Sequence, residues 1–182
     1  MRTRKIILTG LFAALTAIGA FIRIPTPISS FTLQVFFTCM AGLLLGPGLG
    51  AASQAVYVLL GLVGLPIFTQ GGGFSYVTQT TFGFLLGLIP AACITGMIAR
   101  RKTMSFWWLL LACLAGTAAV YVIGLPYMHC ILRFYLNKTW SIQQTVMGGM
   151  VIFLPWDVLK AIVASLLAKK LMPNLHKVGL QY

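Results

Sequence analysis

The sequence contains a single acidic residue, Asp157, which lies three positions before Lys160 in the apolar segment 153–161. On a helix, residues three apart share one face, with Cβ atoms about 5 to 6 Å apart, so the two side chains can pair or hold one polar ligand. An unpaired charge inside a membrane costs roughly 2.5 to 3.5 kcal/mol, and such residues usually face an interior or a cavity. We therefore interpret the pair as a binding site, with a purely structural ion pair as the alternative.

The composition indicates that this pair lies in an integral membrane protein. Hydrophobic residues make up 59% of the chain and charged residues 8%, whereas soluble domains have about 45 to 50% and about 25%. The net charge of +12 does not indicate a nucleic-acid partner, because the cations form short clusters at the ends of apolar runs. Cations in those positions orient helices and contact anionic lipid.

The apolar runs predict an all-α, polytopic membrane protein with six transmembrane helices in one domain, 1–182. The runs are separated by proline, glycine and charge, and they cover 6–22, 32–46, 49–65, 80–99, 105–125 and 143–168. A turn at Gly46 and Pro47 predicts a hairpin of the second and third helices, with the short second helix partly interfacial. Pro155 is expected to kink the last helix just before Asp157.

The basic residues predict the orientation of these helices. With six spans, nine cations fall on one side: Arg2, Arg4, Lys5, Arg100, Arg101, Lys102, Lys169, Lys170 and Lys177. By the positive-inside rule this side is the cytoplasm, so both termini are predicted to be cytoplasmic. Arg23, Arg133 and Lys138 then lie outside.

Two of the predicted external segments, 23–32 and 65–79, carry proline, hydroxyls and aromatic rings but almost no charge. The triplet 71–73 is all glycine, which allows a backbone to approach a ligand closely. These segments fit either a lid over an uncharged or amphipathic molecule or a flexible interfacial loop with aromatic anchors.

The first predicted helix has a different feature, small residues at three- and four-residue spacing. The groove they leave packs within the chain or receives a partner.

The sequence lacks the motifs of catalysis and of metal binding. The four cysteines are far apart without a C-x-x-C pair, and the two histidines are isolated, so no metal or cofactor is expected. No P-loop, second intramembrane aspartate or serine-nucleophile elbow is present. We therefore expect no catalytic residues and no enzyme, and substrate binding for transport remains.

Six blocks, in their order and spacing, resemble the BioY family, the biotin-binding S components of energy-coupling factor (ECF) vitamin transporters. The blocks are FTLQ at 31–34, AGLLLGP at 41–47, GLVGLPIF at 61–68, GGG at 71–73, TFGFLLGLIPAA at 81–92 and LPWDVLKA at 154–161. The resemblance implies a six-helix S component in a prokaryotic cell membrane. Such a protein captures biotin from outside and docks on a shared transmembrane coupling protein that carries two ATPase subunits.

The resemblance also implies roles for individual residues. Asp157 would accept the ureido N–H groups of biotin, and Lys160 would donate to its carbonyl or hold Asp157 in place. The remaining implied contacts come from the external segments: Phe31 as an apolar wall, and the loop with Phe68, Gly72, Gly73, Tyr76 and Gln79 as a cover whose last two residues make polar contacts.

On the first helix, Ala13 and Ala17 match the A-x-x-x-A pattern that such S components offer to the coupling protein. The chain departs from the family where Thr80 replaces a frequent proline and Gln79 replaces asparagine or glycine. Two other functions remain open on the residues alone: a solitary proton-coupled carrier with Asp157 as the titrating group, and a membrane scaffold subunit that transports nothing.

Overall fold

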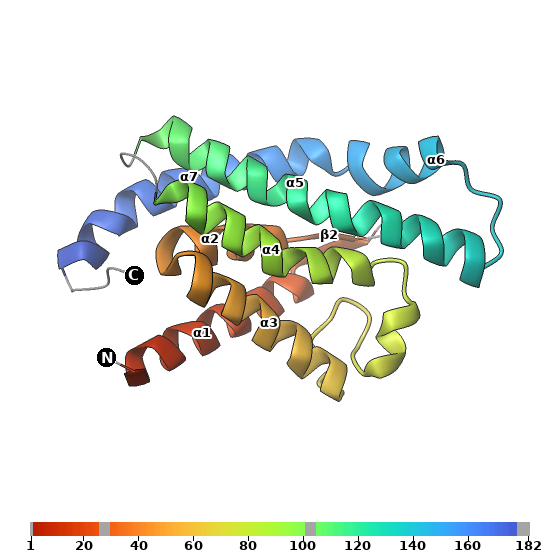
Figure 1. The fold of residues 1–182 in the computed structure, drawn as a ribbon, viewed down its shortest axis with the longest axis horizontal. Coiled ribbons are helices and arrows are strands. Elements are labelled where there is room, and N and C mark those ends of the chain that lie inside the picture. The colour runs from red at the N-terminus through yellow and green to blue at the C-terminus, as the bar shows by residue number, and fades with distance from the viewer. Residues whose placement is uncertain (1, 26–29, 101–104, 178–182) are drawn as a thin grey trace.

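The protein is a bundle of six helical segments in a computed structural model that describes residues 2–25, 30–100 and 105–177 (Figure 1). The first five segments are α1 (Arg2–Phe21), α2 (Gln34–Leu45), α3 (Pro47–Val63), α4 (Phe82–Ala99) and α5 (Phe106–Cys130), which continues into a π-helical turn, η2 (Ile131–Tyr135). The sixth consists of α6 (Ile142–Val146), a π-helical turn η3 (Met147–Val151) and α7 (Leu154–Lys177). A 3₁₀ turn, η1 (Phe74–Thr78), precedes α4.

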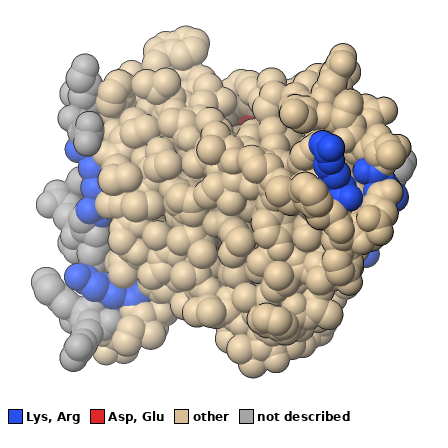
Figure 2. Space-filling model, turned by 45° about the vertical axis from the view of Figure 1, so that its right-hand side comes forward, with Lys and Arg blue, Asp and Glu red and all other residues tan. Residues whose placement is uncertain are grey.

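The predicted six-helix, multi-pass membrane architecture is confirmed. Among the described residues, four segments are long and apolar enough to cross a membrane: Thr3–Phe21, Phe82–Ala99, Phe106–Tyr135 and Ile142–Pro173. The other two, α2 and α3, are shorter apolar helices. The start of α1, the end of α4 and the end of α7 lie at the same end of the bundle (Figure 1). Lysine and arginine gather toward the two ends of the molecule and leave a band of other residues between them (Figure 2).

Helix α2 lies in the centre of the bundle, and the expectation that it is partly interfacial in the membrane stays a prediction. It packs against α1, α3, α4, α5 and α7. Close packing is possible because Gly42 has no side chain, since a Cβ there would lie 2.6 Å from the backbone oxygen of Ala92. The predicted hairpin with α3 is confirmed: Gly46 adopts a φ of 81°, and Pro47 occupies the first turn of α3.

The segment 23–32, expected as a loop, contains a two-stranded antiparallel hairpin of β1 (Arg23–Pro25) and β2 (Ser30–Thr32). Arg23 pairs with Thr32, and Ile24 with Phe31. The ring of Phe31 packs against those of Phe153 and Trp156, at centroid distances of 4.4 and 5.9 Å. The hairpin is thereby fixed against the start of α7.

The last helical segment is interrupted before Asp157, but the interruption precedes Pro155 and is not the kink expected at this proline. Residues 152 and 153 form a turn, and α7 begins at Leu154 with Pro155 in its first turn. A proline is tolerated in the first turn because no intrahelical bond to its nitrogen is lost there. Asp157 also lies in this turn, where the partial positive charge of the helix N-terminus stabilises a carboxylate.

Candidate functional site

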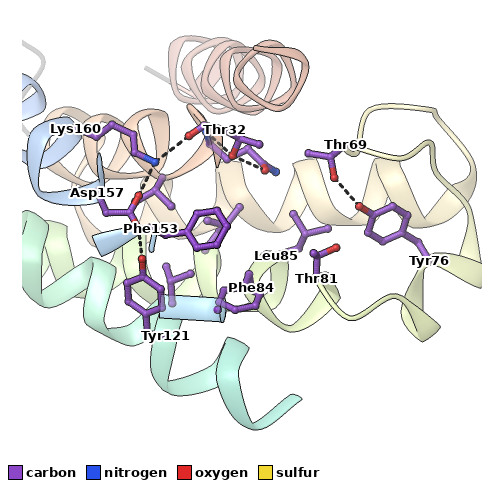
Figure 3. Close-up of a pocket in the computed structure, with 15 residues that line it drawn as sticks. Thr32, Thr69, Tyr76, Thr81, Phe84, Leu85, Tyr121, Phe153, Asp157 and Lys160 are labelled. Atoms are coloured by element: carbon purple, nitrogen blue, oxygen red, sulfur yellow. Dashed lines mark hydrogen bonds and ion pairs between the residues drawn. The ribbon is translucent and has the colours of Figure 1, made fainter. Parts of the chain in front are cut away.

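A cavity of about 80 Å³ lies between the hairpin and helices α2, α4, α5 and α7 (Figure 3). Segments that are far apart in the sequence contribute its walls. The lining residues are Thr32, Gln34, Val35, Thr69, Tyr76, Thr81, Phe84, Leu85, Leu88, Val120, Tyr121, Gly149, Phe153, Asp157 and Lys160.

One end of this cavity is charged. The Lys160 ammonium lies 2.5 Å from the Asp157 carboxylate; the Asp157 side chain is buried and the Lys160 side chain is half-buried. Lys160 also donates a hydrogen bond to the backbone oxygen of Thr32, at 2.9 Å, and Tyr121 on α5 donates to the second carboxylate oxygen of Asp157. Each charge therefore has an opposite charge and a neutral hydrogen-bond partner, which is the arrangement a buried ion pair requires.

The other end carries hydroxyl groups without charge. The Tyr76 and Thr69 hydroxyls lie 2.8 Å apart. The Thr81 hydroxyl is buried without a hydrogen-bond partner in the part of the chain that the structure describes. An unpaired buried polar group costs about 1 to 3 kcal/mol. Figure 3 shows this hydroxyl end and the charged end on opposite sides of an apolar middle that includes Phe84 and Leu85. The cavity thus matches a molecule with two polar ends and an apolar body.

Gln34, which lines the cavity, makes hydrogen bonds to two other segments. Its side-chain oxygen accepts a bond from the Thr32 hydroxyl at 2.9 Å, and its amide nitrogen donates to the Tyr57 hydroxyl at 2.8 Å. Tyr57 in turn donates to the backbone oxygen of Ile67 at 3.1 Å. These three hydrogen bonds connect the hairpin, α3 and the 64–81 connection, which all contribute to the walls of the cavity or support them.

Of the residues expected to bind ligand, Asp157, Lys160 and Tyr76 line the cavity. Phe31 lies outside its lining, against Phe153, which does line it. Phe68 is 1% exposed and packs its ring against Tyr57 and Tyr76, at 5.5 and 4.7 Å. Phe31 and Phe68 therefore support the wall, and their direct contact with a ligand stays a prediction.

The other expected ligand residues shape the connection before α4. Gly72 lies against the backbone of Leu65, since a Cβ at Gly72 would be 2.1 Å from the Leu65 oxygen. Gly73 has a φ of 103° and donates its N–H to the backbone oxygen of Gly61 at 2.7 Å. Gln79 is exposed and does not line the cavity. Ligand contacts by these three residues stay predictions.

Sequence reasoning missed Tyr121 and the polar roles of Thr81 and Gln34. Tyr121 lies in the middle of an apolar helix. Because a buried tyrosine hydroxyl usually finds a hydrogen-bond partner, its position was a signal that sequence reasoning could have used. Thr81 and Gln34 both belong to blocks that carried the family resemblance, but their types alone did not distinguish packing from binding.

On α1, the structure corrects the expectation for Ala13. This residue is 4% exposed and packs with Tyr57 and Val58 of α3, so it belongs to the core. Ala17 is half-buried beside the same cluster. Gly10 and Ala14 are the small residues exposed on these turns. The small-residue groove therefore packs partly within the chain, and contact with a coupling protein stays a prediction.

A second groove, on the lateral surface of the bundle, reaches the charged end of the cavity at Asp157. It runs between α5 and the η3–α7 segment, has a volume of about 510 Å³ and is lined mostly by apolar side chains, with Tyr121 and Asp157 in its wall. In Figure 2 red atoms are visible in a hollow of the surface, and Asp157 is the sole acidic residue of the chain. Tyr121 and Asp157 thus separate the cavity from this groove.

Known proteins match this chain over nearly its whole length. The BioY of Lysinibacillus sphaericus is 43% identical over 170 residues, which cover 93% of this chain and 87% of that protein. The biotin transporter BioY of Thermotoga maritima is 38% identical over 169 residues, covering 92% and 95%. A solved structure of the S-component for biotin from an ECF-type ABC transporter shares the fold, with a TM-score of 0.82, 22% identity and coverage of 94% and 92%.

The model of the BioY family matches residues 1–177. Because this match and the two relatives extend over all six helical segments, the chain belongs to the BioY family.

Proposed function

We propose that this chain binds biotin in the cavity between α2, α4, α5 and α7 and serves as the substrate-binding S component of an ATP-driven importer. The observation that carries the proposal is the Asp157–Lys160–Tyr121 cluster, which lies at one end of an otherwise uncharged cavity in a BioY family member. The proposal includes no catalytic step by the chain itself.

The chemistry of biotin suits the charged end. Its ureido group has two N–H donors and one carbonyl acceptor. The Asp157 carboxylate offers about four acceptor positions, and Lys160 and Tyr121 use two of them. The two that remain can accept the ureido N–H groups, while Lys160 donates its third N–H to the ureido carbonyl.

The rest of biotin suits the remainder of the cavity. The apolar middle takes the sulfur-containing ring and the aliphatic chain. The Thr81 hydroxyl and one hydroxyl of the hydrogen-bonded Thr69–Tyr76 pair then donate to the ligand carboxylate at the far end. Small-molecule sites generally measure about 300 to 1,000 Å³, so we expect the cavity to widen on binding through movement of the 64–81 connection.

Isothermal titration of the purified chain tests the substrate. Biotin should bind tightly, and thiamine and riboflavin should not bind. Asp157→Asn should abolish biotin binding, whereas Arg133→Gln, which removes an exposed cation outside the cavity, should leave it unchanged. Biotin binding that survives Asp157→Asn, or no binding by the unaltered chain, contradicts the proposal.

The energy for transport comes from partner subunits in this proposal, because the chain has no P-loop. A transmembrane coupling protein with two ATPases would dock on α1 from the cytoplasmic side, where both termini are placed by the positive-inside rule. Uptake should require those partners and ATP. Uptake by the chain alone that an uncoupler abolishes would instead indicate a proton-coupled carrier.

Two alanine variants separate docking from internal packing. Ala14→Leu changes an exposed position on α1, so biotin binding should persist while ATP-driven uptake falls. Ala13→Leu changes a core position, so the melting temperature itself should fall. Undiminished uptake by the Ala14→Leu variant would show that this face of α1 does not dock on the coupling protein.

A further inference from the structure

We propose that a groove between the end of α1, the β1–β2 hairpin and α7 binds an anionic phospholipid. The groove has a volume of about 450 Å³, and its walls include Ile22, Ile24, Trp156, Leu159 and Val163. It is separate from the ligand cavity, although Thr32 and Lys160 contribute to both.

The walls of this groove fit an acyl chain. The five apolar side chains are exposed, from 40% for Val163 to 63% for Ile24. Trp156, Leu159 and Val163 belong to a segment long enough to span a membrane, Ile142–Pro173, so their exposed surfaces lie at the depth of lipid hydrocarbon. A concave apolar surface at that depth is filled by lipid hydrocarbon, because a water molecule there would have no hydrogen-bond partners.

Arg23 supplies the site for a phosphate at one end of the groove. It directly follows the α1 span and is exposed, so its guanidinium lies at headgroup level. One guanidinium nitrogen donates to the backbone oxygen of Thr69. A guanidinium has five N–H donors in a planar fork, and this fork matches the oxygens of a phosphate.

The charge balance of the chain favours a separate anionic molecule as a further partner of Arg23. The chain has 13 lysines and arginines but only one acidic residue. That residue, Asp157, is already bonded to Lys160 and Tyr121, so no side-chain carboxylate is left for Arg23. A cation beside an exposed apolar groove therefore favours an anionic amphiphile over a zwitterionic lipid.

Trp156 lies in the groove and reports on its occupant by fluorescence. In a Trp107→Phe, Trp108→Phe, Trp140→Phe background, Trp156 is the only tryptophan. This variant is placed in two kinds of phosphatidylcholine vesicle. In one, a small fraction of the lipid is acyl-brominated phosphatidylglycerol, and in the other the same fraction is acyl-brominated phosphatidylcholine. We expect the brominated phosphatidylglycerol to quench Trp156 fluorescence more strongly.

Charge variants test the role of Arg23. Arg23→Gln should reduce quenching by phosphatidylglycerol to the level of phosphatidylcholine, while Arg23→Lys retains part of the preference. Arg133→Gln removes an exposed cation outside the groove, so this variant should keep the full preference for phosphatidylglycerol. Melting temperatures confirm that each variant is folded.

Equal quenching by the two brominated lipids in the Trp156 background overturns the proposal. A preference that survives Arg23→Gln overturns it as well. If excess inorganic phosphate abolishes the preference without any change in vesicle composition, the groove binds a free anion and not a phospholipid, which also contradicts the proposal.

Discussion

Lys160 donates a hydrogen bond to the backbone oxygen of Thr32, 2.9 Å away across 128 positions of sequence. The same ammonium is paired with Asp157. One side chain therefore joins the β1–β2 hairpin to α7 at the charged end of the cavity. Because Lys160 holds both the hairpin and the carboxylate, the structural and the binding roles of the pair require separate tests.

Lys160→Met should lower the melting temperature of the chain and abolish biotin binding. It leaves the buried Asp157 carboxylate without its opposite charge, and breaking a buried pair in this way costs about 3 to 5 kcal/mol. The double variant Asp157→Asn, Lys160→Met removes both charges, so it should recover most of the melting temperature without recovering binding. Thermal unfolding in detergent and titration with biotin measure the two effects. Stability as low in the double variant as in the single one would contradict this account of the pair.

Tyr121→Phe should weaken biotin binding about tenfold or more, because it removes a hydrogen bond to a charged group, worth about 1.5 to 3 kcal/mol. The aromatic ring and its packing remain. Tyr135→Phe is the matched control, since Tyr135 is exposed on η2 and lies outside the cavity. Titration with biotin gives both dissociation constants. Equal affinities for the two variants would show that Tyr121 does not organise the charged end.

Thr81→Val should weaken biotin binding by about five- to tenfold, the effect of losing one ordinary hydrogen bond of about 1 to 1.4 kcal/mol, with no loss of stability in the absence of ligand. The hydroxyl it removes is buried without a partner in the cavity wall. Thr95→Val is the matched control, because the Thr95 hydroxyl is also buried and unpartnered but lies outside the cavity. Comparison of biotin with its methyl ester identifies the ligand group involved. A larger effect of Thr95→Val on affinity than of Thr81→Val would exclude a ligand contact by Thr81.

Gly96→Ala should destabilise the bundle by about 1 to 3 kcal/mol, the usual effect of overpacking. A Cβ at this position would lie 2.4 Å from the backbone nitrogen of Pro47, and the backbone there cannot move aside cheaply. Gly48→Ala is the control, because a Cβ at Gly48 has nothing within 4 Å. Thermal unfolding of the two variants in the same detergent makes the comparison. Equal melting temperatures would mean that the α2–α3 turn does not pack closely on α4.

The sequence by itself determined the class of the protein and the charged pair that lines its cavity. Transmembrane helices are set by local composition, because each needs a continuous apolar run of sufficient length. The runs therefore predicted six helices, and the glycine and proline at 46 and 47 predicted the hairpin of α2 and α3. The Asp157–Lys160 pair was visible because a lone acidic residue in an apolar run is costly wherever it is buried, whatever surrounds it.

Only the tertiary structure decided which other side chains meet that pair. Helices α4 and α5 are apolar on all sides, and because lipid is as apolar as a protein core, the sequence does not reveal which face points inward. For this reason Tyr121 was missed. The family resemblance implied that Ala13 docks on a partner, and only the structure shows that it lies in the core. The cavity forms where segments from 32 to 160 converge, and such convergence depends on packing between helices and not on any local pattern.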